Sequence, residues 1–319
     1  MAESLTVTRD DVLAAAGRIS RWVERTPLIE AQIRGHRLWL KCESLQTGGS
    51  FKLRGATNRL LQLNDEERRR GVVAFSSGNH AQGVAIAAKR LGMPATIVMP
   101  ADAPELKIEN TKSHGAEVLL YDRRTEDRVA IAERLAESTG ATVVPSFDDP
   151  HIVAGQGTVG LELAEQLSIS GAGQLSRVVV NCGGGGLAAG IALACPDADV
   201  VPIEPDGWDD MLQSLALGSI VPVGKDAPAT MCDAIQTPQV SPITFGILAA
   251  RNARGAAVSD AEVAAAVRWA WHEHGLTVEP GGAASLAAIL SEKVAVVPET
   301  VIVLSGGNID PALHARLVA

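Results

Sequence analysis

The sequence has no excess of basic residues, no long apolar segment and no paired cysteines. Lysine and arginine number 28 against 37 aspartate and glutamate, a formal net charge of −9. Nucleic-acid-binding proteins usually present a basic face, so this balance argues against that class. No apolar stretch reaches the roughly 18 residues that cross a bilayer, and we expect no membrane span. The N-terminal residues MAESLTVTRDD lack a basic-then-apolar leader, so we expect no signal peptide.

Cysteine is also scarce. The four cysteines lie far apart, at Cys42, Cys182, Cys195 and Cys232, and none forms a C-x-x-C pair. This spacing argues against a zinc or redox motif. A chain of 319 residues buries a large core and does not need disulfides for stability. We therefore expect reduced cysteines and a cytoplasmic location.

Short apolar runs alternate with helical segments along the whole chain. A capping box, in which Thr8 is followed three residues later by an acidic residue, predicts a first helix. The runs that predict strands are 38–43, 72–76, 95–100, 117–122, 142–147, 177–181, 199–204 and 300–305. Because these runs are continuously apolar and alternate with helices, they predict an α/β fold with largely parallel sheets.

Three of the predicted strands are followed by loops of small residues. The loops read SSGNHAQG, CGGGGLAAG and SGGNID. Since ligands of open α/β sheets bind at the carboxyl ends of strands, the three loops predict one shared site. The four consecutive glycines 183–186 precede a predicted helix, which is typical of a phosphate-binding loop.

The glycine loop also partly matches a dinucleotide fingerprint. Gly184, Gly186 and Gly190 follow a strand, and Glu204 lies about 20 residues further on, where a ribose-binding acid would stand. A tight turn without a ligand is the other alternative. Against the dinucleotide alternative, the segment SFKLRGA places Lys52 between Phe51 and Leu53, an apolar setting that lowers a lysine pKa and favours amine chemistry.

Seven segments in order resemble the serine/threonine dehydratase and serine racemase family, which are fold-type II enzymes dependent on pyridoxal 5′-phosphate (PLP). They are TPL (26–28), LKCESLQTGGSFKLRGA (40–56), SSGNHAQGVAIAA (76–88), AGQGTVGLEL (154–163), CGGGGLAAG (182–190), VEPGGAASLAA (278–288) and SGGNID (305–310). The resemblance implies two open, twisted, mostly parallel sheets flanked by helices, as in the tryptophan synthase β-subunit. It also implies that the phosphate at the glycine loop belongs to PLP.

The resemblance assigns the cofactor contacts residue by residue. Lys52 matches the lysine that forms the Schiff base with PLP and acts as the base at substrate Cα, and Phe51 is expected near the ring. Asn79 matches the partner of the phenolic oxygen, and Ser305 the partner of the pyridine nitrogen. The phosphate cradle matches Gly183, Gly184, Gly185, Gly186 and Leu187. A hydroxyl partner holds the pyridine nitrogen less strongly than a carboxylate, which favours elimination over transamination.

Substrate contacts follow from the same resemblance. The loop residues Ser76, Ser77, Asn79 and His80 are expected to bind the substrate carboxylate at a helix start. For His80, capping of that helix is the alternative. Simple threonine dehydratases usually have alanine in place of Ser77, whereas racemases and some hydroxyaspartate dehydratases have serine, so we assign Ser77 a catalytic role on the face opposite Lys52. Arg134 is expected near a second substrate carboxylate, with an exposed helix surface as the alternative.

The segment IEPDGWDD resembles the divalent-cation site of the racemase branch. The implied ligands are the carboxylates of Glu204 and Asp210 and the main-chain carbonyl of Trp208. Oxygen ligands suit Mg²⁺ or Ca²⁺. Under this interpretation Glu204 is a metal ligand rather than a ribose ligand. An acidic surface turn is the alternative.

Two positions depart from the family pattern. Ala234 stands where glycine usually follows the aspartate of MCDAIQTPQ, and Gly281 stands where alanine is common. Both changes lie near the expected cofactor and leave the substrate open. The chain ends at residue 319, without the regulatory domain of biosynthetic threonine dehydratases, so we expect no feedback inhibition by isoleucine.

We expect residues 1–70 and 147–319 to form a large PLP-binding domain and residues 71–146 a small mobile domain. The predicted function is an ammonia-lyase that acts on serine, threonine or 3-hydroxyaspartate. The alternatives are an amino-acid racemase, a nucleotide-binding oxidoreductase and a non-catalytic protein of the same fold. The expected partners are a small amino-acid substrate and a second copy of the chain, because members of the family are commonly homodimers.

Overall fold

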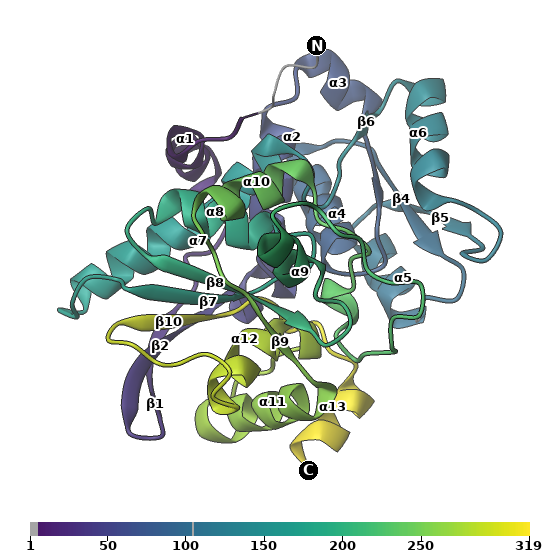
Figure 1. The fold of residues 1–319 in the computed structure, drawn as a ribbon. Coiled ribbons are helices and arrows are strands. Elements are labelled where there is room, and N and C mark those ends of the chain that lie inside the picture. The colour runs from purple at the N-terminus through teal and green to yellow at the C-terminus, as the bar shows by residue number, and fades with distance from the viewer. Residues whose placement is uncertain (1–5, 104) are drawn as a thin grey trace.

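The protein is built on two separate sheets, as the sequence predicts (Figure 1). The computed structural model describes residues 6–103 and 105–319. In spatial order, the larger sheet contains β1 (Leu28–Ile33), β2 (His36–Cys42), β10 (Thr300–Leu304), β7 (Arg177–Asn181), β8 (Asp199–Pro205) and β9 (Ala256–Val258). The smaller sheet contains β5 (Glu117–Tyr121), β4 (Ala95–Pro100), β3 (Val72–Phe75) and β6 (Thr142–Val143). Neighbouring strands are parallel except β1 and β2.

Helices cover the faces of both sheets. They are α1 (Arg9–Ile19), α2 (Lys52–Leu61), α3 (Asp65–Arg70), α4 (Asn79–Leu91), α5 (Glu105–Ser113), α6 (Arg128–Thr139), α7 (Pro150–Ile169), α8 (Gly186–Ala194), α9 (Asp210–Leu217), α10 (Pro242–Ala250), α11 (Asp260–His274), α12 (Pro280–Leu290) and α13 (Pro311–Val318). The predicted capping box of the first helix is confirmed, since Thr8 and Asp11 bond each other reciprocally.

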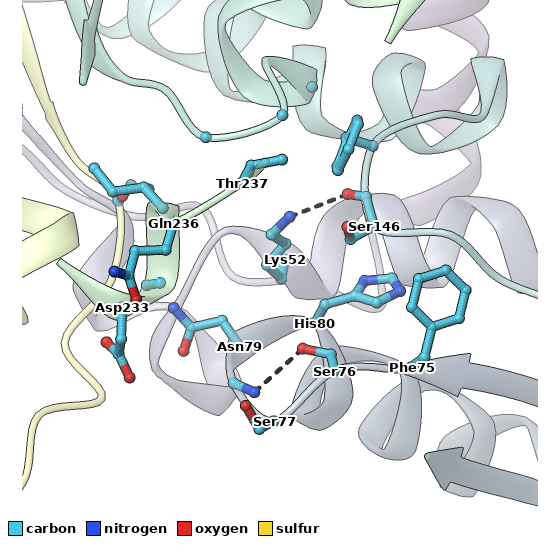
Figure 2. Close-up of a pocket in the computed structure, with 18 of the residues that line it drawn as sticks. Lys52, Phe75, Ser76, Ser77, Asn79, His80, Ser146, Asp233, Gln236 and Thr237 are labelled. Carbon is cyan, nitrogen blue, oxygen red and sulfur yellow. Dashed lines mark hydrogen bonds between the residues drawn. The ribbon is translucent and has the colours of Figure 1, made fainter. Parts of the chain in front are cut away.

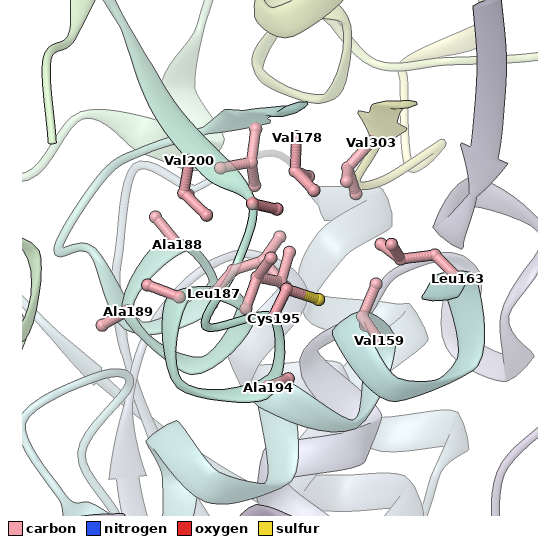
Figure 3. Close-up of a cluster of buried hydrophobic side chains, with 14 of the residues drawn as sticks. Val159, Leu163, Val178, Leu187, Ala188, Ala189, Ala194, Cys195, Val200 and Val303 are labelled. Carbon is pink, nitrogen blue, oxygen red and sulfur yellow. The ribbon is translucent and has the colours of Figure 1, made fainter. Parts of the chain in front are cut away.

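Two hydrophobic cores lie on opposite faces of the larger sheet. In Figure 1, α7 and α8 cover one face and α11 and α12 the other. On the α7–α8 face, Val178 and Val303 of the central strands pack with Leu163 and Leu187 (Figure 3). The neighbouring residues Val179 and Ile302 belong to the other core. Burial on both faces explains why these strands are continuous apolar runs in the sequence.

The predicted strands agree with the observed ones, with three exceptions. β6 ends at Val143, because Pro145 cannot donate a ladder hydrogen bond and the chain leaves the sheet there. β1 and β9 have no counterpart among the predictions. Both are edge strands that mix buried and partly exposed positions, so neither has a long apolar run.

Helix α2 lies between the two sheets. Its residues Leu53, Ala56 and Leu60 share a core with strands of the smaller sheet, and the helix also packs against α7. The chain leaves the smaller sheet after β6 and reaches α7 through residues 144–149, which we call the connecting segment. This arrangement places the start of α2 beside the connecting segment.

No helix among residues 6–103 and 105–319 combines the length and the apolarity needed to cross a bilayer. Cys42, Cys182, Cys195 and Cys232 are all free and buried. Burial raises the pKa of Cys42, Cys195 and Cys232 to about 12 and that of Cys182 well above its usual value. These thiols are therefore protonated at neutral pH, and none is an activated nucleophile.

Candidate active site

A cavity of about 1140 Å³ lies between the two sheets. The three predicted loops line it together: the one after β3 with Ser76 and Ser77, the one after β7 with the four glycines, and the one after β10 with Ser305. The prediction that these loops share one site agrees with this geometry. The volume is sufficient for a cofactor and a small substrate.

Lys52 is the first residue of α2 and points into the cavity (Figure 2). Its amine donates a hydrogen bond of 3.0 Å to the carbonyl oxygen of Ser146 in the connecting segment. The amine also lies 5.2 Å from the centre of the Phe51 ring, which lines the same cavity. Burial lowers the pKa of Lys52 to about 8. A substantial fraction of this amine is thus neutral near neutral pH, which carbonyl chemistry requires.

The glycine loop leads directly into α8. Gly185 has a φ of 84°, a conformation that disfavours other residues, and it precedes the first helical residue, Gly186. A Cβ at Gly184 would overlap the ring of Phe147 in the connecting segment. The protein's own packing therefore requires glycine at Gly184. The first N–H groups of α8 have no partner within the helix and, together with the helix dipole, favour an anion.

Asn79 and His80 open α4, and both are buried. His80 Nε2 lies 2.8 Å from the carbonyl oxygen of Val144. A carbonyl only accepts, so Nε2 carries the hydrogen and Nδ1 is left buried without a partner. Burial and the charge of Lys52 lower the pKa of His80 to about 3 against the opposing hydrogen bond to Val144. His80 is therefore neutral and does not cap the helix through its side chain.

Ser305 lines the cavity directly after β10 and is oriented by Asn181 at the end of β7. Asn181 Nδ2 donates to Ser305 Oγ at 2.9 Å and to the carbonyl oxygen of Gly282 at 2.8 Å. Asn181 Oδ1 accepts from the main-chain N–H of Ser285. Because Ser305 Oγ already accepts from Asn181, its own hydrogen is free for an acceptor in the cavity.

The small sheet contributes most of the positive charge around the cavity. Lys107, Arg123 and Arg128 line it. Lys107 is paired with Asp233 across the cavity, and Arg123 is paired with Asp102. Arg128, the first residue of α6, stacks over the Phe75 ring at 5.8 Å. Of these three side chains, Arg128 is the one for which no ion pair is found within the described part of the chain.

The placement of Arg134 near the substrate is not supported by this geometry. Arg134 lies on an exposed face of α6 and does not line the cavity. Arg134 follows Arg128 by six residues, so the two side chains point about 120° apart around the helix axis. Both side chains are exposed, but only that of Arg128 lines the cavity.

The predicted cation ligands gather at the start of α9, outside the cavity lining. Both Glu204 oxygens accept from main-chain N–H groups, of Met211 at 2.9 Å and Leu212 at 2.8 Å. Asp210 Oδ2 accepts from Val240 N–H at 2.7 Å, and Oδ1 is buried without a partner. Burial and the charge of Asp210 raise the pKa of Glu204 well above its usual value. Burial raises that of Asp210 to about 7.

This pair of buried carboxyls fits a cation better than a ribose. No cation of the described residues contributes to either pKa, and Asp210 Oδ1 is available as a ligand. Trp208 stands between them in sequence, and its indole N–H donates to the carbonyl oxygen of Pro228. No cluster of three or more His, Cys, Asp or Glu side chains that could hold a metal ion is found among residues 6–103 and 105–319. Because Glu204 faces α9, the dinucleotide alternative lacks its ribose ligand.

The sequence analysis missed three residues that line the cavity. Phe147 packs on the glycine loop, Glu279 bonds Asn79, and Asn308 bonds Asn79 from the other side. Glu279 and Asn308 belong to the segments VEPGGAA and SGGNID, which were assigned by resemblance without a role for either residue. Their contacts with Asn79 join parts of the chain that are 200 and 229 residues apart, which no local pattern reveals.

The site fits PLP on three grounds. An amine of lowered pKa lies in the cavity, a glycine loop opens a helix beside it, and a hydroxyl with a free hydrogen lines the same cavity. The fold and the site together define a PLP-dependent enzyme with two parallel-sheet units.

Comparison with known proteins agrees with this class. The sequence pattern of the pyridoxal-phosphate dependent enzyme family matches residues 19–306, and the chain belongs to that family. It is 43% identical to the L-threo-3-hydroxyaspartate ammonia-lyase of a Pseudomonas species over 97% of both chains. It is 39% identical to the serine racemase of Schizosaccharomyces pombe over the full length of both chains. The structure of maize serine racemase is similar, with a TM-score of 0.91, 34% identity and coverage of 98% of this chain and 96% of that one.

Proposed function

We propose that the protein is a PLP-dependent ammonia-lyase that converts a β-hydroxy-α-amino acid to a keto acid and ammonia. The observation that carries the proposal is that a buried amine, Lys52, and a hydroxyl with a free hydrogen, Ser305, line one cavity. The similarity to the Pseudomonas ammonia-lyase supports it. Loss of the β-hydroxyl and of the amino group requires removal of the proton at Cα, so the site must provide a base there.

Lys52 is the base at Cα in this proposal. The bound cofactor supplies an electron sink for the charge that develops at Cα. With a pKa of about 8, the amine of Lys52 is able to accept the Cα proton near neutral pH. The carbonyl oxygen of Ser146 holds that amine in place.

Ser305 and Asn79 both act as donors. Ser305 accepts from Asn181, so its hydroxyl hydrogen is directed to an acceptor such as an unprotonated ring nitrogen. A neutral ring nitrogen is a weaker sink than a protonated one, which favours departure of a group from Cβ over transamination. The cofactor's phosphate lies at the start of α8 in this proposal, against the N–H groups that follow Gly185.

The substrate's carboxylate lies at the start of α4, at Ser76, Ser77 and Asn79. That helix end is positively polarised, and Gly78 N–H already bonds Ser76 Oγ, which fixes the loop. His80 supports the loop through Val144 rather than by direct contact. A second, distal carboxylate would meet Arg128, which favours 3-hydroxyaspartate among the candidate substrates.

The proposal is tested by incubating the PLP-loaded protein with serine, threonine and threo-3-hydroxyaspartate and measuring keto acid and ammonia. We expect stoichiometric release of both with at least one substrate. Lys52→Ala is the matched control, and it should remove turnover without unfolding the protein. Turnover at the parent rate in Lys52→Ala contradicts the assignment of the base.

Racemisation is the second candidate function, and Ser77 is the observation that favours it. A racemase needs a proton donor and acceptor on both sides of Cα, and Ser77 lines the cavity from the β3–α4 loop while Lys52 enters from α2. In Ser77→Ala we expect dehydration of L-substrates to persist and any interconversion of enantiomers to fall at least about tenfold, roughly 1.4 kcal/mol of barrier. Chiral chromatography beside the keto-acid assay measures both rates.

A structural Mg²⁺ or Ca²⁺ bound by Glu204, Asp210 and the Trp208 carbonyl is part of the proposal. The unpartnered, buried Asp210 Oδ1 supports it, together with two adjacent buried carboxyls that lack a neutralising cation. We also propose that the unit 71–146 moves as a small domain that closes over the substrate and excludes water. The cavity between the two sheets supports this motion.

Location and assembly complete the proposal. Four free, buried cysteines are consistent with a reducing compartment such as the cytoplasm. A homodimer follows from the resemblance to dimeric members of the family, and light scattering at several concentrations tests it.

A further inference from the structure

Glu279 stands at the N-cap of α12 but does not cap that helix. An N-cap side chain ordinarily accepts a hydrogen bond from the second or third N–H of its own helix. The side chain of Glu279 turns into the cavity instead, where Oε1 accepts a 2.5 Å hydrogen bond from Asn79 Nδ2. The residue is 4% exposed. A buried carboxyl that gives up its local helix contact has a role in the cavity.

Asn79 is bonded at both ends of its amide. Asn308 Nδ2 donates to Asn79 Oδ1 at 2.7 Å and to the carbonyl oxygen of Gly48 at 2.8 Å. The atom of Asn308 that faces a carbonyl must be its nitrogen, so the atom of Asn79 beside it must be the oxygen. Glu279 keeps an accepting oxygen whether or not its carboxyl is protonated, and Oε1 accepts from the nitrogen of Asn79. Both partners therefore fit the same orientation of one amide.

One donor of Asn79 remains after these bonds are counted. The oxygen is used by Asn308, and one hydrogen of Nδ2 is used by Glu279. The second hydrogen of Nδ2 is left for an acceptor in the cavity. An amide turned the other way would present its oxygen to the cavity and would repel an oxygen acceptor.

The surrounding backbone is shaped to admit the Glu279 carboxyl. A Cβ on Gly306, in the loop after β10, would overlap Oε1. The main-chain N–H of Glu279 donates to the Gly306 carbonyl at 3.0 Å, which ties the two segments together. The segments VEPGGAA and SGGNID thus meet at Asn79, and each contributes one of its two partners.

We propose that Glu279 and Asn308 are positioning residues that hold the Asn79 amide with its nitrogen toward the cofactor's phenolic oxygen. The inference rests on the proposed binding of PLP. Burial keeps water from competing for the Asn79 amide, so loss of either partner leaves the amide held at one end only and makes its rotation easier. Glu279 acts in this way only through Asn79, which separates its role from that of a residue that touches the reacting atoms.

The test compares bound-cofactor spectra in Asn79→Ala, Glu279→Ala, Asn308→Ala and the double variant Asn79→Ala/Glu279→Ala. The visible absorbance and fluorescence of PLP depend on the hydrogen bond at its phenolic oxygen. We expect all three single variants to change the spectrum in the same direction. We also expect each to weaken the affinity of the cofactor-free protein for PLP about tenfold, the size of one hydrogen bond to a polar group.

Non-additivity and rescue identify a positioning role. The double variant should match Asn79→Ala alone, because Glu279 has no effect once Asn79 is gone. Glu279→Gln should restore the parent spectrum, since its amide oxygen accepts from Asn79. An unchanged spectrum in Glu279→Ala or Asn308→Ala, or an additive effect in the double variant, overturns the inference.

Two further outcomes are distinguishable. If Glu279→Ala does not fold, Asn308→Ala and Glu279→Gln decide the question on their own, because a purely structural role for the pair predicts the parent spectrum in Asn308→Ala. If the parent protein takes up no PLP and shows no visible absorbance, the proposed function fails and this inference fails with it. If the parent binds PLP and the variants show the parent spectrum, this inference is overturned and the proposed function is not affected.

Discussion

The ring of Phe147 packs on Gly184, so that the connecting segment touches the glycine loop directly. One residue earlier, the Ser146 carbonyl accepts from the amine of Lys52. Asp149 then starts α7 by capping it and pairs with Arg59 of α2 at 2.9 Å. Two consecutive residues between the two sheets, Ser146 and Phe147, therefore contact Lys52 and the glycine loop respectively. A movement of residues 71–146 relative to the larger sheet would therefore change the contacts of both Lys52 and the glycine loop.

Replacement of Gly184 by alanine tests this contact. The new Cβ would overlap the Phe147 ring, so either the ring or the glycine loop must move. We expect a loss of stability of about 1–3 kcal/mol, typical of overpacking, and a weaker affinity for PLP. Gly246→Ala is the matched control, because Gly246 lies in α10 with nothing near its Cβ position, and it should leave both unchanged. Equal melting temperatures and equal PLP affinities for the two variants would contradict the expectation.

The rate at which the cofactor-free protein takes up PLP should depend on pH through the titration of Lys52. Attachment of PLP requires the neutral amine, and burial lowers the pKa of Lys52 from 10.5 to about 8. In cofactor-free protein, the rate at which visible absorbance appears on mixing with PLP should rise with pH and reach half its maximum near pH 8. His80 adds no titration in this range, because its pKa is about 3. A midpoint near 10.5 would mean that the amine is exposed to solvent.

Much of the fold was predictable because its signals are local. Buried parallel strands are apolar runs, and Thr8 with Asp11 forms a capping box that depends on four consecutive residues. The edge strands β1 and β9 were missed because partial exposure gives them no such run. The loops of the site were found since each directly follows a strand.

The remaining parts of the site depend on distant contacts. The sequence analysis named Arg134 and not Arg128, because only the packing of α6 shows which side chain of this helix lines the cavity. Phe147 and Glu279 were missed because their partners, Gly184 and Asn79, are distant in sequence. Sequence thus predicted which loops form the site, whereas the orientation of an amide or a ring required the three-dimensional structure.

The stability of the cofactor-free protein should depend on pH through Glu279. Burial raises the pKa of Glu279 from 4.5 to about 7, with Asp233 adding to the shift and Asn79 and Lys107 opposing it. The folded protein therefore holds a proton that the unfolded chain has released. This contribution is fully present below pH 4.5 and is lost as pH rises through about 7.

Glu279→Gln removes that titration and keeps an acceptor for Asn79. The free energy of unfolding of the variant minus that of the parent should therefore increase by about 3 kcal/mol as the pH rises from 4.5 to above 7. Urea unfolding of both proteins at several pH values measures the difference. A difference that does not change with pH would mean that Glu279 titrates normally.

The cation site predicts a response to chelation. If Glu204 and Asp210 bind Mg²⁺ or Ca²⁺, a chelator should lower the melting temperature and either ion should restore it, because an ion that binds only the folded state stabilises it by mass action. Asp210→Asn should abolish the response. Asp233→Asn is the control, since Asp233 is an acid paired with Lys107 on the other side of the cavity. If neither the chelator nor the ions change the melting temperature of the parent protein, no structural cation is bound at Glu204 and Asp210.

Arg128 and Arg134 provide a matched pair for substrate recognition. Both belong to α6, but only Arg128 lines the cavity, where it stacks on Phe75 and has no ion-pair partner among the described residues. A distal carboxylate would give Arg128 that partner in a closed site, where a charged hydrogen bond contributes about 1.5–3 kcal/mol.

We expect Arg128→Met to lower kcat/KM for threo-3-hydroxyaspartate at least about tenfold, the equivalent of 1.4 kcal/mol, and that for serine much less. Serine has no distal carboxylate. Comparing the loss of kcat/KM for the two substrates therefore separates recognition of that carboxylate from general damage to the site. Arg134→Met should leave both values at the parent level, because the side chain lies on the exposed face of α6. Equal losses on both substrates in Arg128→Met would assign that arginine to closure of the cavity, and a selective loss in Arg134→Met would reverse the assignment of the two residues.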